Sequence, residues 1–128
     1  MPGAASVPGT GGSKLITFTP WAGLAPMPRV FTGTLTIDLL LGDVRSLKEK
    51  RGLVKPVLAE LNRRAAVAAA EVGAQGLHRR TVLGVAVVAG SHRRVVELLD
   101  DCEGAVTRRP EFEVLSVRRR IHSDEDDD

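Results

Sequence analysis

Apolar and polar side chains alternate strictly along the first regular segment of the chain. From residue 31 every second position up to Leu41 is apolar or glycine, while threonines and Asp38 occupy positions between them. A period of two places these sets on opposite faces of a β-strand. We expect one face of this strand to be buried and the other to meet water, because a strand covered on both faces is apolar throughout.

A helix is predicted to follow at about residues 46–64. Ser46 and Glu49 fit a capping box, in which the serine oxygen accepts the Glu49 amide and the glutamate reaches back to the Ser46 amide. The helical period then separates apolar from cationic side chains. The apolar side holds Leu47, Leu53, Val54, Val57, Leu58 and Leu61, and the cationic side holds Lys48, Arg51 and Lys55.

The second half of the chain completes the pattern. Residues 66–72 fit a helix or a strand by composition, whereas residues 81–89 are a clear apolar strand. Ser91 caps a second amphipathic helix that ends at about Arg108, and residues 112–121 form the last strand. With a strand at 66–72, the order βαββαβ predicts an α+β, ferredoxin-like split βαβ sandwich: a four-stranded antiparallel sheet with two helices on one face.

Composition divides the chain into three parts. Residues 1–26 are rich in Gly, Pro, Ala, Ser and Thr and are expected to form a flexible leader. Residues 27–122 form the ferredoxin-like domain, and residues 123–128 form an acidic tail that is expected to be disordered.

The single cysteine, Cys102, falls on the apolar stripe of the second helix, which indicates a packing role.

The cellular setting follows from two further features. A lone thiol that cannot form an internal disulfide fits a reducing compartment. The chain has no apolar run near the roughly 20 residues that cross a bilayer, and its start lacks the pattern of a signal peptide. We therefore expect a cytoplasmic protein without membrane contact.

The segment from about Phe31 to His122 resembles the YlxP-like bacterial family, a family of unknown function. The resemblance implies a ferredoxin-like fold, and genes of that family often lie beside translation and ribosome-maturation genes; it implies no activity. The motifs that carry it are Gly33-Thr34-Leu35, Asp43-Val44-Arg45-Ser46-Leu47-Lys48-Glu49-Lys50-Arg51, Ala70-Glu71-Val72, Leu83-Gly84-Val85-Ala86-Val87-Val88 and Leu115-Ser116-Val117-Arg118-Arg119-Arg120.

Charge is distributed unevenly along the chain. The overall charge is +2, but residues 27–122 hold 17 Lys and Arg against 11 Asp and Glu, and the tail carries five acidic residues. A basic surface of this kind fits RNA phosphates. Without stacking aromatics on the sheet or a GxxG loop, binding would be to backbone and shape. The predicted nucleic-acid-binding residues are Arg45, Lys48, Lys50, Arg51, Lys55, Arg79, Arg80, Arg118 and Arg120.

These cations predict a non-catalytic RNA- or ribosome-associated factor. The alternative is a homo-oligomeric interaction module or small-ligand-binding module, which would use the uncovered sheet face around Thr32, Thr34 and Thr36. In that case the cations would only solubilise the protein and form surface ion pairs. Salt separates the two, because only RNA binding should weaken steeply with ionic strength.

Side chains with catalytic potential are few. His78, His92 and His122 lack metal-ligand spacing, and no cysteine or carboxylate cluster completes a site. Asp38 lies on the polar face of the first strand, and Glu71 is placed near it across the sheet, which would give two carboxylates for acid–base work. Solvated carboxylates remain the simpler interpretation, so we predict no catalytic residue, metal or cofactor.

Overall fold

Six regular elements follow one another in the computed structural model, which describes residues 28–124. Their order, βαββαβ, is the one that the sequence predicts, and residues 67–72 lie in a strand rather than a helix. Their bounds are β1 Phe31–Leu41, α1 Leu47–Asn62, β2 Val67–Gly73, β3 Arg80–Ala89, α2 His92–Thr107 and β4 Phe112–Ser123. The predicted leader, residues 1–26, lies outside the described residues, as do residues 125–128 of the predicted tail.

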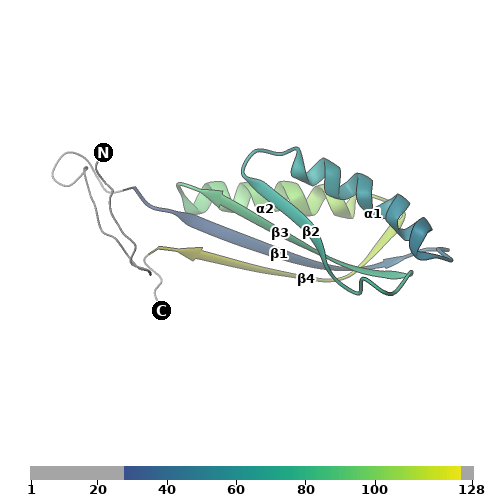
Figure 1. Cartoon of the computed structure of the whole chain (residues 1–128). Coiled ribbons are helices and arrows are strands. Elements are labelled where there is room, and N and C mark those ends of the chain that lie inside the picture. The colour runs from purple at the N-terminus through teal and green to yellow at the C-terminus, as the bar shows by residue number, and fades with distance from the viewer. Residues whose placement is uncertain (1–27, 125–128) are drawn as a thin grey trace, which may run out of the picture.

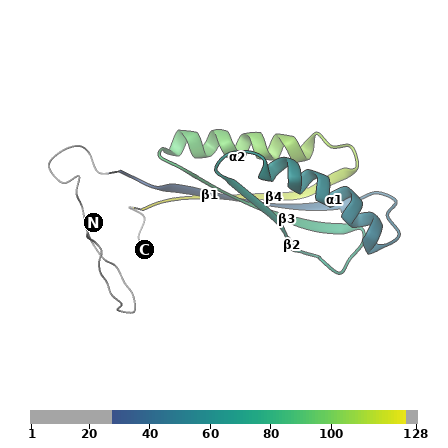
Figure 2. The same ribbon diagram turned by 45° about the horizontal axis from the view of Figure 1, so that its top comes forward.

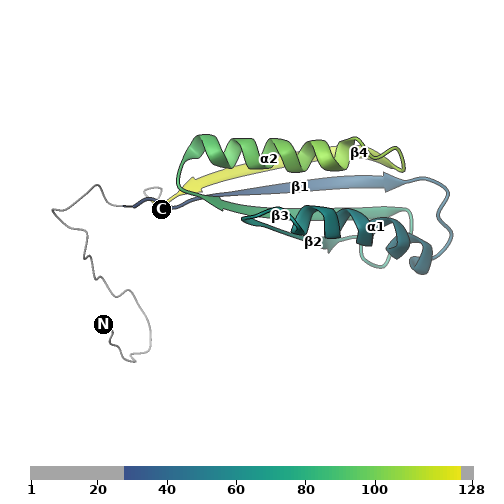
Figure 3. The same ribbon diagram turned by 90° about the horizontal axis from the view of Figure 1, so that it is seen from above.

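One antiparallel sheet carries all four strands, in the order β2-β3-β1-β4. Both helices lie on the same side of this sheet (Figures 1 and 2). Seen from above, α2 lies toward the β1–β4 side and α1 toward the β2–β3 side (Figure 3). This is the α+β, ferredoxin-like arrangement that the sequence predicts.

The core lies between the sheet and the two helices. Leu35, Ile37 and Leu39 of β1 are fully buried, which confirms the alternation, and they meet apolar side chains of both helices. Gly33 continues this buried row beneath α2, and a Cβ atom there would stand 2.6 Å from Cγ1 of Val95. Glycine at this position therefore lets the helix approach the strand closely.

Ser46 caps the start of α1 as predicted, but the Glu49 side chain reaches back one residue further than expected, to Arg45. Ser46 Oγ accepts the Glu49 amide at 3.1 Å. Glu49 Oε1 accepts the backbone amide of Arg45 at 2.7 Å, and the prediction that it reaches back to the Ser46 amide is wrong. The carboxylate still satisfies a backbone donor at the helix entry, so the cap keeps its function.

Asn62, the last residue of α1, covers the outer edge of β2. Its side-chain amide donates to the Ala69 carbonyl at 2.9 Å and accepts the Ala69 amide at 2.8 Å. The side chain thus forms the pair of hydrogen bonds that a neighbouring strand would form. An edge strand blocked in this way is protected against pairing with another chain.

Candidate functional site

Three cations of α1 form one exposed surface, which we call the α1 basic face: Lys48, Arg51 and Lys55. All three are exposed, because Val54 and Val57 turn the opposite side of the helix into the core. Within residues 28–124, none of the three takes part in an ion pair or a side-chain hydrogen bond. Arg45 lies just before the cap, is 79% exposed and reaches Asp43 at 3.6 Å.

Most cations on the helix side of the molecule are instead paired with carboxylates. Arg64 binds Asp101 and Glu60, and Arg109 binds Glu60 at 2.6 Å. Hydrogen bonding to Asp101 raises the pKa of Arg64, and bonding to Glu60 raises that of Arg109. Such pairs leave little charge for an external anion. The α1 basic face therefore differs from these arginines in having unpaired charge.

Lys50 is a correction to the predicted nucleic-acid-binding set. Its side chain is 2% exposed and points into the protein, so it cannot contact RNA from the surface. It stands four residues before Val54 and seven before Val57, which are both buried. The helical period therefore places Lys50 with the core, and this spacing was the signal in the sequence that could have identified it.

The Lys50 ammonium is held by Glu71 and by the β2–β3 connection, and Thr81 holds Glu71; we call these groups the Lys50 cluster. Lys50 Nζ lies 2.8 Å from Glu71 Oε2 and donates to the carbonyls of Ala74 and Leu77 at 2.7 Å each. The Thr81 hydroxyl donates to the same carboxylate oxygen of Glu71 at 2.7 Å. A buried charge with these partners ties the connection to α1 and has a structural role.

The remaining predicted cations lie elsewhere. Arg79 Nε donates to the carbonyls of Leu41 and Gly42, at the end of β1. Three others project from the face of the sheet that no helix covers, which we call the open face. They are Arg80, Arg118 and Arg120, as their pairing with Leu40, Thr36 and Thr34 requires. The nine predicted residues therefore form no single surface, because the sheet separates Arg80, Arg118 and Arg120 from the α1 basic face.

Asp38 and Glu71 lie on opposite faces of the sheet, and the prediction that they adjoin is wrong. Asp38 is on the open face, where Arg80 holds it through a two-pronged contact at 2.8 Å to each carboxylate oxygen. Glu71 points toward the helices and belongs to the Lys50 cluster. The two carboxylates cannot share a proton or a substrate, so this pair offers no acid–base chemistry.

The described residues also bear on metal and thiol chemistry. No group of three or more His, Cys, Asp and Glu side chains is arranged to hold a metal ion in the described part of the chain. Cys102 is fully buried, as predicted, and burial raises the pKa of its thiol. In the same part of the chain, no helix is both long and apolar enough to span a bilayer.

The open face has an apolar half and a polar half. The apolar half lies on β2 and β3 and consists of Ala68, Ala70, Val72, Val82, Gly84, Ala86 and Val88. The polar half lies on β1 and β4 and includes the threonines at 32, 34 and 36 and the arginines at 118 and 120. The division follows the strands, because side chains of paired residues point to the same face.

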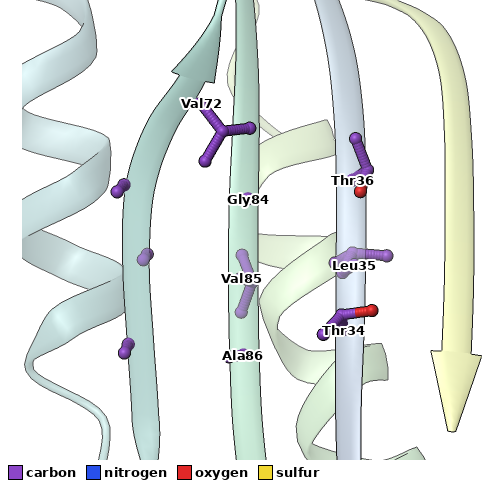
Figure 4. Close-up of a pocket in the computed structure, with 10 residues that line it drawn as sticks. Thr34, Leu35, Thr36, Val72, Gly84, Val85 and Ala86 are labelled. Atoms are coloured by element: carbon purple, nitrogen blue, oxygen red, sulfur yellow. The ribbon is translucent and has the colours of Figure 1, made fainter.

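Small residues hollow the apolar half. A shallow depression of about 480 Å³ lies over β1, β2 and β3, and a second of about 400 Å³ adjoins it around Val88. Figure 4 shows the first, with the side chain of Val72 beside Gly84. A Cβ atom on Gly84 would stand 2.8 Å from Cγ1 of Val72, so glycine makes room for this valine.

Comparison with known proteins places the chain among proteins of unknown function. The model of the family described as "Protein of unknown function (DUF503)" matches residues 32–119. "Uncharacterized protein YlxP" of Bacillus subtilis (strain 168) is 30% identical over 86 residues, which are 67% of this chain and 94% of that protein. The structure is also similar to the de novo designed protein Foldit4, with a TM-score of 0.42 and 14% identity over 73% of this chain and 96% of that chain. The extent of the family match and the YlxP relationship establish that the chain belongs to the DUF503, YlxP-like family.

Proposed function

We propose that this protein binds the phosphate backbone of RNA, free or in a ribosomal particle, through the α1 basic face. The observation that carries the proposal is the unpaired state of Lys48, Arg51 and Lys55 on one side of a rigid, capped helix. Cations that already pair with carboxylates gain less from a phosphate, because they must first give up a partner. The α1 basic face has no such cost.

The rest of the surface favours contact with the backbone over contact with the bases. Among the described residues the aromatic side chains are Phe31 and Phe112, which belong to the core or pack against it. The described part of the open face therefore offers no Phe, Tyr or Trp ring on which a base could stack, although RNA-binding sheets commonly depend on such rings; its aromatic ring is the imidazole of His122 at the end of β4. Three flexible cations along about 10 Å of helix can instead neutralise neighbouring phosphates of one strand.

The proposal predicts a steep dependence on salt. Neutralising three phosphates releases their counterions, so the logarithm of the association constant should fall with the logarithm of salt concentration with a slope of about −2 to −3. A labelled RNA oligonucleotide titrated with the protein at several salt concentrations measures this slope by fluorescence anisotropy. A slope near zero would favour the alternative, an interaction or ligand-binding module without a nucleic-acid role.

Charge reversal locates the interface. The triple variant Lys48→Glu, Arg51→Glu, Lys55→Glu should bind the oligonucleotide at least about 100-fold more weakly and should no longer sediment with ribosomal particles. Its melting temperature should stay near that of the wild type, because all three side chains are exposed.

A second triple variant on α2 controls for net charge. Arg93, Arg94 and Arg108 are also exposed, and reversing them changes the charge by the same amount. This variant should keep most of the binding. Equal loss in both variants would mean that overall charge, rather than the α1 basic face, determines RNA binding, and the proposal would then be wrong.

A further inference from the structure

We infer that the open face is a dimer interface, and that its apolar half packs against the apolar half of a second copy of this chain. The inference is independent of RNA binding, because it concerns the opposite side of the sheet from α1. Three observations support it: the apolar side chains of the open face, the hydrogen bonds that cover part of the β2 edge, and the area of the face.

The composition of the open face is that of an interface core with a rim. The apolar half carries no charge, and two of its large side chains are well exposed, Val72 at 58% and Val88 at 48%. Threonines and the arginines 118 and 120 border it along β1 and β4, and Arg80, paired with Asp38, borders it at the end of β3 next to Val82. A central apolar patch bordered by polar groups is the usual anatomy of a protein–protein contact.

The apolar half carries both projections and hollows, so the same surface of a second copy can fit it. Val72 and Val88 project beside the depressions that the small residues Ala68, Gly84 and Ala86 create. In a two-fold contact each copy supplies the same patch, so the valines of one copy can fill the depressions of the other. A two-fold axis in the plane of the interface and perpendicular to the strands sets apolar half against apolar half. It also sets polar half against polar half, so Arg118 and Arg120 of the two copies come together at the margin of the contact and stay in water there.

Area and edge protection both favour face-to-face packing. Four strands about 4.8 Å apart and about ten residues long give a face of about 600 Å² per copy, or about 1,200 Å² for two copies, the lower bound of stable interfaces; the apolar half supplies about half of this area, so the contact needs the whole open face. Asn62 occupies the outer edge of β2 at Ala69, which disfavours extension of the sheet from that edge. The open face therefore remains as the apolar surface by which two sheets can meet.

This dimer would deepen the proposed function without depending on it. The helices of each copy would lie on the outside, so both α1 basic faces would point away from the interface in opposite directions. A long RNA or a ribosomal particle could then meet one or both of them. A short oligonucleotide should bind each copy independently.

Analytical ultracentrifugation of the full chain tests the inference. The wild type should sediment at twice the 13.7 kDa mass of one chain, and the dimer should persist at high salt because its contact is apolar. Ala86→Glu places a charge at the centre of the apolar half on an exposed side chain, and should shift the protein to a monomer with at least about a hundredfold weaker association. Thr107→Glu, exposed on α2, is the matched control and should remain dimeric.

The results that overturn the inference are distinct from those that overturn RNA binding. A monomeric wild type at every concentration, or an Ala86→Glu protein that remains a dimer, would exclude this interface. If circular dichroism shows that Ala86→Glu does not fold, Val88→Glu on the same half provides the same test. A folded monomeric variant that still binds a short oligonucleotide would support both conclusions, whereas loss of RNA binding in the α1 triple variant leaves the dimer unaffected.

Discussion

At the scale of single residues, Lys50 shows that the position of a residue in a helix can outweigh its type. As a lysine in a cation-rich stretch it was assigned to the RNA-binding surface, yet the helical period places it with Val54 and Val57 in the core. Its partners could not be read from the sequence, because the carbonyls of Ala74 and Leu77 reach it only through the tertiary fold. Position in the helix was the more reliable guide.

Replacing Lys50 with methionine should destabilise the protein strongly. The variant keeps most of the side-chain volume but leaves the Glu71 carboxylate without its cation, and breaking one partner of a buried pair costs about 3–5 kcal/mol. Urea denaturation measures the free energy of unfolding. Lys48→Met, exposed two residues earlier, is the control and should change it by less than about 0.5 kcal/mol. Similar stability of the two variants would contradict a structural role for the Lys50 cluster.

At the scale of elements, the pattern of the sequence is sufficient to locate the strands and helices. It is insufficient to say which face of each element every residue occupies. The six elements, including the ambiguous segment that became β2, follow from periodicity, capping residues and the topology that βαβ connections allow. The sequence puts Glu71 on the wrong face because β2 has alanines on both of its faces, at 68, 69 and 70. Its sequence therefore shows no alternation of apolar and polar residues. Only the pairing with β3 determines which way Glu71 points.

Asn62 is an element-level feature with a measurable consequence. Asn62→Ala removes both hydrogen bonds to Ala69 and exposes the β2 edge, so the free energy of unfolding should fall by about 1 kcal/mol and the protein should aggregate sooner on heating. Asn62→Asp retains the acceptor for the Ala69 amide, so its free energy of unfolding should lie between those of the wild type and Asn62→Ala. Light scattering during thermal unfolding reports both effects. An Ala variant that matches the wild type would show that water replaces the amide without loss.

At the scale of the whole molecule, the sheet divides the basic residues into two groups that the sequence could not separate. Lys48, Arg51 and Lys55 face outward from α1, while Arg118 and Arg120 project from the open face. Both groups are cationic and exposed, so composition alone treats them as one surface. Because the sheet separates the two groups, we propose RNA binding and self-association for different sides of the molecule.

An ion-pair network joins the two helices and the α2–β4 connection, and it should make stability depend on pH. Glu60 contacts Arg64 and Arg109, and Arg109 also reaches Glu111 at 3.4 Å. Hydrogen bonding to Arg109 lowers the pKa of Glu60 below its ordinary value of 4.5. A lowered folded-state pKa means that the contribution of Glu60 is complete above 4.5 and is lost as the pH falls through the folded-state value.

Comparison of the wild type with Glu60→Gln tests this pH dependence. The variant should be less stable at neutral pH, because Arg109 and Arg64 lose their charged partner. The difference in free energy of unfolding should shrink as the pH falls below 4.5 and the wild-type carboxyl becomes protonated. Denaturant titrations at a series of pH values measure it. A difference that is constant with pH would mean that Glu60 stabilises the fold through packing and not through its charge.

The pairing of the two ends of the described region, residues 28–124, has a practical consequence. Phe31 pairs with Ser123, and the amide of Asp124 donates to the Val30 carbonyl at 3.1 Å, so the chain enters and leaves the sheet at one place. The 11 residues of β1 then separate this place from the start of α1 by about 35 Å. An affinity tag or a sensor-chip linker joined beside residue 30 or 124 would leave the cationic helix accessible, so immobilised protein can be used to test nucleic-acid binding without masking the surface under study.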